Sequence, residues 1–149
     1  MLLTSLLIAI LASSPSELEA WEQSKFYTRP QQITTPKVDL STHPIGRRYR
    51  TQLKRTVAAG VNFAGHYSLV RWGCGTSCTQ LAIVDLLTGE IWHDPKLIAT
   101  RGVEFRADTR LLAFNPRGED GAGFPKIPVE YFEWTGRTLR RVRPPRTAP

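Results

Sequence analysis

The stretch VNFAGHYSLVRWGCGTSCTQLAIVDLLTGEIWHD, from Val61 to Asp94, decides the fold. It holds both cysteines of the chain, Cys74 and Cys78, in a short turn that also contains glycine. Two apolar runs, His66–Trp72 and Gln80–Leu86, flank this turn and have the length and composition of strands. The stretch therefore predicts two strands that are joined tightly at the cysteines.

The chain continues as short strands separated by turn residues. The expected strands are Glu90–His93, Val103–Arg106, Arg110–Phe114, Val129–Thr135 and Arg137–Val142. Three short connections, Leu87–Gly89, Ala107–Thr109 and Thr135–Gly136, are expected to be hairpin turns, and in the first and third glycine takes the left-handed conformation. Because parallel strands need long crossovers, these short turns predict antiparallel pairing.

One helix is expected before the strands, over residues 45–59. Tyr49, Leu53 and Val57 recur at a spacing of four and so lie on one helix face. Gly60 suits the C-terminal end of such a helix. The apolar stripe is narrow, which indicates a helix that lies on a sheet and is not buried all round.

The strand and turn pattern also resembles part of a β-propeller blade. AIVDLLTGEIW, which starts at Ala82, and VEFRADTRLLAF, which starts at Val103, each read as strand, turn and strand. The 149 residues are too few for a closed propeller. We therefore expect an α+β fold, in which a single antiparallel, propeller-blade-like sheet of five to seven strands packs with one N-terminal helix.

The domain organisation follows from composition. Residues 1–20 resemble a signal peptide, with an apolar run and Ala20 before the cleavage site, although no Lys or Arg precedes the run. A buried first helix or strand is the alternative. A flexible arm is expected over 21–44, a single α+β domain over 45–142 and a disordered basic tail over 143–149. The loop Asn115–Pro128 is rich in Gly and Pro.

The formal charge of the chain is +7, with 20 Lys and Arg against 13 Asp and Glu. Removal of residues 1–20 would discard Glu17 and Glu19 and no basic residue, which raises the charge to +9. Such a charge favours an anionic partner in the cell envelope, and the alternative is that it serves solubility alone. Nucleic acid is not expected as a partner of an exported protein, and no membrane span is expected after the leader is removed.

Two motifs carry a resemblance to a known family. Asn62–Tyr67 (NFAGHY) and Trp72–Cys78 (WGCGTSC), together with LLAF at Leu111–Phe114 and YFEW at Tyr131–Trp134, resemble a family of small exported bacterial proteins without an assigned activity. The resemblance covers about residues 47–142. It implies a bacterial, periplasmic or secreted protein, and it carries over no catalytic residue.

The cysteines leave several kinds of chemistry open. In an oxidising compartment, Cys74 and Cys78 are expected to form a structural disulfide. If Cys74 is reduced, it could instead be a nucleophile with His66 as its base. It could also form a redox pair with Cys78, although the usual redox motif has two residues between its cysteines and this chain has three. A zinc site of Cys74, Cys78, His66 and His93 has the right ligands but no familiar spacing, so we expect no metal and no cofactor.

Four aromatic residues in the expected strands have two interpretations. Trp72, Trp92, Tyr131 and Trp134 either pack in the core or form a face that binds a partner, since Trp and Tyr are enriched at interface hot spots. We expect a non-catalytic exported binding protein, of the inhibitor, immunity or envelope-accessory type, whose partner is a protein or an anionic envelope component. The alternative is a cysteine-dependent enzyme or redox protein centred on Cys74 and His66.

Overall fold

The computed structural model describes residues 25–116 and 127–143. The expected signal peptide, most of the basic tail and the centre of the Asn115–Pro128 loop lie outside these residues. The elements are α1 (Ile45–Arg48), α2 (Arg50–Ala58), β1 (Tyr67–Gly75), β2 (Cys78–Asp85), β3 (Ile91–Trp92), β4 (Val103–Glu104), β5 (Leu111–Phe114), β6 (Glu130–Trp134) and β7 (Leu139–Val142). Among the described residues, no helix has the length and apolar character that a membrane crossing requires.

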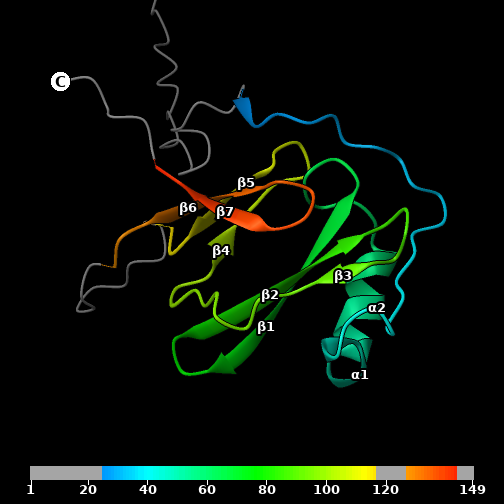
Figure 1. Cartoon of the computed structure of the whole chain (residues 1–149), viewed down its shortest axis with the longest axis horizontal. Helices are drawn as coiled ribbons and strands as arrows, with labels where there is room; N and C mark the ends of the chain where they lie inside the picture. The colour runs from blue at the N-terminus through cyan, green and yellow to red at the C-terminus, as the bar shows by residue number, and fades with distance from the viewer. Residues whose placement is uncertain (1–24, 117–126, 144–149) are drawn as a thin grey trace, which may run out of the picture.

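The strands form two antiparallel sheets, and the helices form a third layer. The first sheet has the order β1-β2-β3 and the second has the order β4-β5-β6-β7. Figure 1 shows α1 and α2 beside the first sheet and the second sheet on its other side. The α+β class is thus confirmed, and the predicted single, blade-like sheet is wrong.

The pattern of apolar residues explains why a single sheet with one helix cannot bury all of the apolar side chains. Neighbouring residues of β1 point to opposite faces, with Leu69 facing the second sheet and Val70 facing the helices. β2 does the same with Ile83 and Val84, so the first sheet is buried on both faces. A single sheet with one helix leaves one such face in water. The second sheet covers that face with Phe114 and other apolar side chains.

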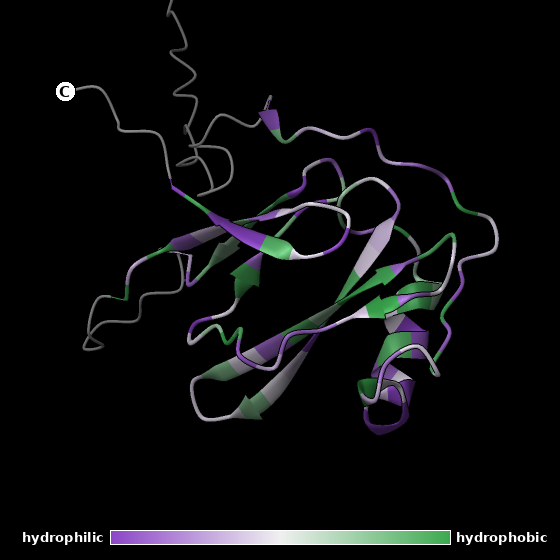
Figure 2. Ribbon diagram, in the orientation of Figure 1, coloured by the Kyte–Doolittle hydropathy of each residue, from purple (hydrophilic) through white to green (hydrophobic). Residues whose placement is uncertain are grey.

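The second sheet also buries apolar residues on its outer face. Leu111, Ala113 and Tyr131 form a small cluster there, and Phe26 of the N-terminal segment packs against it. Figure 2 shows hydrophobic residues concentrated on the inner strands, whereas β7 is largely hydrophilic. Being buried on both faces, β5 reads as the continuous apolar run LLAF.

The expected helix is present as two short helices. Tyr49 stands between them with φ −111° and ψ 24°, outside helical geometry. α1 lies so close to the preceding segment that a Cβ on Gly46 would come within 2.0 Å of the Leu40 carbonyl oxygen. The predicted stripe is correct, because Leu53 and Val57 are buried and Tyr49 packs beside them.

The predicted hairpins are antiparallel pairs in the structure. β2 pairs with β3, β4 with β5 and β6 with β7, and β1 pairs with β2 through the cysteine turn. In the β2–β3 turn, Asp85 Oδ1 accepts the N–H of Leu87 at 2.8 Å and Gly89 has φ +89°. β4 ends at Glu104, so its connection to β5 is longer than predicted, and Arg106 bonds to Asp108 within it.

The segment expected as a flexible arm runs along the domain from residue 25 on. Gln31 N–H bonds to the Gly65 carbonyl and Lys37 N–H to the Leu86 carbonyl. Ile33, Val38 and Leu40 pack against the apolar layer under the helices. In Figure 1 the blue and cyan trace follows the outside of the molecule down to α1. These contacts make residues 25–44 part of the domain's packing.

Candidate functional site

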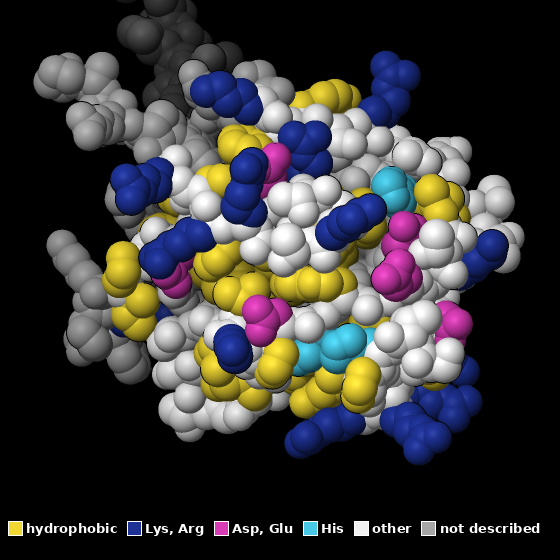
Figure 3. Space-filling model, viewed as in Figure 1, with side chains coloured by type: hydrophobic (Ala, Val, Ile, Leu, Met, Phe, Trp, Pro, Cys, Tyr) yellow, Lys and Arg dark blue, Asp and Glu magenta, His cyan; other side chains and the backbone are white. Residues whose placement is uncertain are grey.

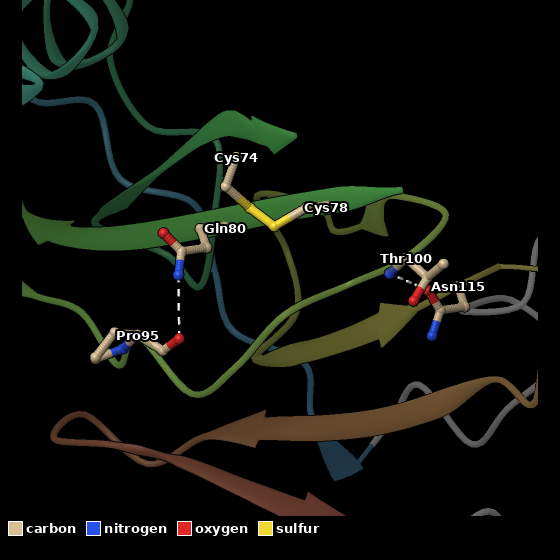
Figure 4. Close-up of a disulfide and its surroundings, with 6 residues drawn as sticks. All are labelled: Cys74, Cys78, Gln80, Pro95, Thr100 and Asn115. Carbon is tan, nitrogen blue, oxygen red and sulfur yellow. Dashed lines mark hydrogen bonds between the residues drawn. A yellow bond between two sulfur atoms is a disulfide. The ribbon is translucent and has the colours of Figure 1, made fainter. Parts of the chain in front are cut away.

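The disulfide lies at the tip of the β1–β2 hairpin. Cys74 and Cys78 are bonded, with their Cα atoms 5.0 Å apart. Gly75 and Ser77 complete the turn with positive φ angles of 133° and 53°. Figure 4 shows the bond joining the ends of the two strands, with Gln80 reaching the Pro95 carbonyl nearby. The expected disulfide is confirmed.

The structure does not bring Cys74 and His66 together. His66 immediately precedes β1, while Cys74 lies near the far end of that strand. At about 3.3 Å per residue the two are separated by more than roughly 20 Å. His66 Nε2 instead faces Asp85 Oδ2 at 3.7 Å. Because the sulfur of Cys74 is bonded and His66 is distant, the structure does not assemble a nucleophile and base from these two residues.

The structure does not group the four side chains of the zinc interpretation. His93 lies beside Trp72 and His43, with ring centroids 5.3 Å and 5.7 Å away, and its Nδ1 is 2.8 Å from the Leu81 carbonyl oxygen. Burial, and secondarily the nearby His93, lower the pKa of His43. Over residues 25–116 and 127–143, no three His, Cys, Asp or Glu side chains are grouped to hold a metal ion.

The four aromatic residues do not form a shared binding face. Trp72 is 4%, Tyr131 7% and Trp134 3% exposed, and each belongs to a different apolar cluster. Trp72 stacks on Tyr49 with ring centroids 4.1 Å apart. Trp92 is half-buried against Trp134. These side chains therefore pack in the apolar clusters of the interior.

The first half of the NFAGHY motif holds several segments together. Asn62 accepts the N–H of Leu69 at 2.6 Å and donates to the Leu69 carbonyl at 3.1 Å, as a neighbouring strand would. Gly65 has φ +87°, and a Cβ there would lie 2.8 Å from Thr28 Oγ1. Its N–H bonds to the Ala107 carbonyl and its own carbonyl accepts from Gln31. The turn thereby connects the first sheet, the β4–β5 connection and the N-terminal segment.

The second half of the motif lines a cavity. His66 and Tyr67 lie on one wall of a space of about 410 Å³ between the start of β1 and the second sheet. The other lining residues are Thr28, Ala64, Arg110, Glu133, Trp134, Thr135, Gly136 and Arg140. The His66 and Tyr67 rings are 4.1 Å apart, and the Tyr67 ring meets Trp134 edge to face at 5.4 Å. We call this space the His66 cavity.

The polar groups of the His66 cavity are arranged around Glu133. Its side chain is 12% exposed and accepts from Arg110 at 3.3 Å and from Arg140 at 2.5 Å. Burial raises the pKa of the Tyr67 hydroxyl, and the Trp134 indole N–H that faces it offsets this rise in part. Trp134 Nε1 is nevertheless buried without a partner at hydrogen-bonding distance among the described residues.

A second candidate surface lies on the helices. We call the exposed side chains of Arg47, Arg48, Arg50, Lys54 and Arg55 the basic helix face. No Asp or Glu stands between Asp39 and Asp85 in the sequence. Figure 3 shows Lys and Arg side chains gathered at the end of the molecule where Figure 1 places α1 and α2. Within the described part of the chain, no carboxylate forms an ion pair with these five residues.

An open depression adjoins the basic helix face. Arg47, Arg50, Leu40 and Ser41 line it, and it has a volume of about 550 Å³. The one carboxylate nearby, Asp39, is bonded to the N–H and hydroxyl of Ser41, which lowers the pKa of Asp39. Two guanidinium groups thus border a hollow that an anionic group can enter.

Sequence reasoning missed the His66 cavity. Its residues come from the N-terminal segment, the NFAGHY motif, the β4–β5 connection, strands β6 and β7 and the turn between those two strands. Only the motif itself was a signal, and it pointed to His66 as a base for Cys74. Comparison of the chain with protein families, curated proteins and solved structures finds no match.

Proposed function

We propose that this protein is a non-catalytic binding protein that uses its basic helix face to dock on a phosphate-bearing anionic polymer of the cell envelope. The observation that carries the proposal is the set of five exposed cations on α1 and α2, uncompensated by any carboxylate of the described chain. Four of the five are arginines, whose planar guanidinium groups suit phosphate oxygens.

The composition of the face favours a polymer over a folded protein. Protein interfaces depend on buried aromatic or aliphatic anchors at their centre. The exposed large hydrophobic side chains of the described residues are Tyr27, Leu87 and Ile98, and none belongs to α1 or α2. A contact made of charges alone suits a flexible chain of repeating anions.

The compartment is part of the proposal. The Cys74–Cys78 disulfide is typical of proteins that reside in oxidising compartments, such as the bacterial periplasm. The signal-like residues 1–20 and the resemblance to small exported bacterial proteins support the same location. An anionic envelope polymer is present there, and a cytoplasmic nucleic acid is not.

Binding of long-chain polyphosphate by the protein, measured over a range of salt concentrations, tests this proposal. The variant Arg47→Gln/Arg50→Gln/Lys54→Gln removes three charges and keeps good helix formers. At about 1 kcal/mol per cation we expect binding to weaken about 100-fold at low salt, and the salt dependence to become shallower.

The matched control removes three exposed cations elsewhere, as Arg29→Gln/Lys37→Gln/Lys96→Gln. It has the same net charge, so it separates a local surface from the overall charge of the protein. If both variants lose affinity equally, the charge serves only as a general attraction and the basic helix face is not the site. Tighter binding of polyglutamate than of polyphosphate would contradict the phosphate class.

A further inference from the structure

We propose that the His66 cavity is a binding site for a small organic carboxylate, separate from the basic helix face. Its residues come from both sheets and the N-terminal segment, and none belongs to α1 or α2. The inference does not depend on the proposed function, because a different surface and a different ligand carry it.

The first argument concerns the Tyr67 hydroxyl. The Trp134 indole nitrogen, which faces this hydroxyl, carries a hydrogen and can only donate, and it has no partner within hydrogen-bonding distance among the described residues. The Tyr67 hydroxyl likewise makes no hydrogen bond to the described residues. The hydroxyl lies beside Gly136, another lining residue, at 3.8 Å from the position of a Cβ there. Tyr67 is therefore ready to donate a hydrogen bond into the cavity.

The second argument concerns the two arginines. Arg110 and Arg140 reach the cavity from opposite sides of Glu133 and share its two carboxylate oxygens. Each guanidinium has five N–H donors, so each keeps donors free after these bonds. Among the lining residues Glu133 balances one of the two charges. Asp85 and Glu90 lie close enough to raise the pKa of Tyr67 and so reduce the net positive charge at the cavity wall. Held in place by Glu133, the two groups form a rim of charged donors.

The balance of donors and acceptors selects the ligand class. Glu133 is the carboxylate among the lining residues, and its oxygens are already occupied by the arginines. The free charged groups of the lining are therefore mostly donors, which favours an anion over a cation, and a sugar would find few acceptors for its hydroxyl hydrogens. Ala64 and the Tyr67 and Trp134 rings supply an apolar wall. A carboxylate on a flat or apolar body matches both the donor rim and this wall.

The test uses benzoate as the probe, with benzamide as its neutral counterpart of similar shape. Titration is followed by NMR, from the indole N–H signal of Trp134 and the backbone amides of His66, Tyr67 and Gly136. We expect benzoate to shift these signals in a saturable manner and benzamide to leave them nearly unchanged. Loss of a hydrogen bond to a charged group predicts about tenfold weaker binding for Tyr67→Phe, which keeps the ring and its packing.

The neighbouring arginines of β7 provide a matched pair. Arg140 lines the cavity, whereas Arg141 points to the other face of the sheet and pairs with Glu130. Arg140→Gln should weaken benzoate binding about tenfold and Arg141→Gln should not change it. The proposal is overturned if benzoate produces no saturable shift, if benzamide binds as well, or if both variants weaken binding equally. Tighter binding of phenyl phosphate would replace the carboxylate class by a phosphate class.

Discussion

At two places in this molecule an asparagine side chain forms the hydrogen bonds to backbone groups that a neighbouring strand would otherwise form. Asn62 bonds to both the N–H and the C=O of Leu69, which satisfies one residue of β1 at an edge where no strand follows. Asn115 has φ +56°, and its Oδ1 accepts the N–H groups of Thr100 and Arg101. Because an unpaired backbone group in a partly buried position is costly, these amides are structural residues.

The Asn62 pair predicts a large stability effect for a residue that is only half-buried. Asn62→Ala should lower the free energy of unfolding by about 2–3 kcal/mol, since two hydrogen bonds are lost and the Leu69 groups stay unpaired. Urea unfolding followed by tryptophan fluorescence measures this. Gln32→Ala removes an exposed amide and should change stability by less than about 0.5 kcal/mol. Equal small effects in the two variants would mean that water replaces Asn62 at no cost.

Asn62 and Gly65 are residue types that favour turns, and local propensity alone would place the Asn62 hydrogen bond within its own turn and assign Gly65 to a bulge. The partner of Asn62 is seven residues away, and Gly65 meets Thr28 and Arg29, which no local pattern connects to it. Local propensity identifies turn-forming residues, whereas their partners depend on how distant segments pack.

At the scale of elements, residue spacing and turn-forming residues predicted the helix and the hairpins, because these features depend on residues close together in the sequence. The spacing of Leu53 and Val57 identified a helical face, and Gly89 identified a hairpin turn. The interruption at Tyr49 was not predictable, because it coincides with contacts to two other elements. Tyr49 stacks on Trp72 of β1, and α1 is pressed against Leu40 at Gly46.

The disulfide should stabilise the β1–β2 hairpin without being needed to form it. The ring from Cys74 to Cys78 is short, so the loop-entropy model gives a contribution of about 2 kcal/mol. The strand pairing from Tyr67↔Asp85 to Gly73↔Thr79 lies outside the disulfide ring, and Thr79 also pairs with Ala99. We expect reductant to lower the free energy of unfolding in urea by about this amount, while circular dichroism stays native.

The double variant Cys74→Ser/Cys78→Ser is the control for this measurement. Its stability should equal that of the reduced protein and should not respond to reductant. A variant that is unfolded in the absence of denaturant would show that the disulfide is required for the fold, contrary to this expectation.

At the scale of the whole molecule, the sequence predicted the α+β fold class but not the division of the strands into two stacked sheets. Continuous apolar runs such as LAIV, from Leu81 to Val84, indicate burial without showing what covers each face. After Trp92 the chain pairs with the first sheet once more, at Ala99 with Thr79, and enters the second sheet at Val103. The His66 cavity exists only because this crossover places the second sheet against the start of β1, so it could not be seen in any single motif.

Asn115 stabilises the crossover between the sheets in two ways, through the hydrogen bonds of its side chain and through its left-handed backbone conformation. Two substitutions should separate these contributions to the free energy of unfolding. Asn115→Gly keeps the left-handed backbone conformation but leaves the N–H groups of Thr100 and Arg101 without their acceptor, which should cost about 2–3 kcal/mol of unfolding free energy. Asn115→Ala adds the strain of a positive φ, about 1 kcal/mol more. Urea unfolding of both variants separates the two contributions. If Asn115→Ala proves as stable as Asn115→Gly, residue 115 changes its backbone conformation at no cost, and the joint between the sheets is held by other contacts.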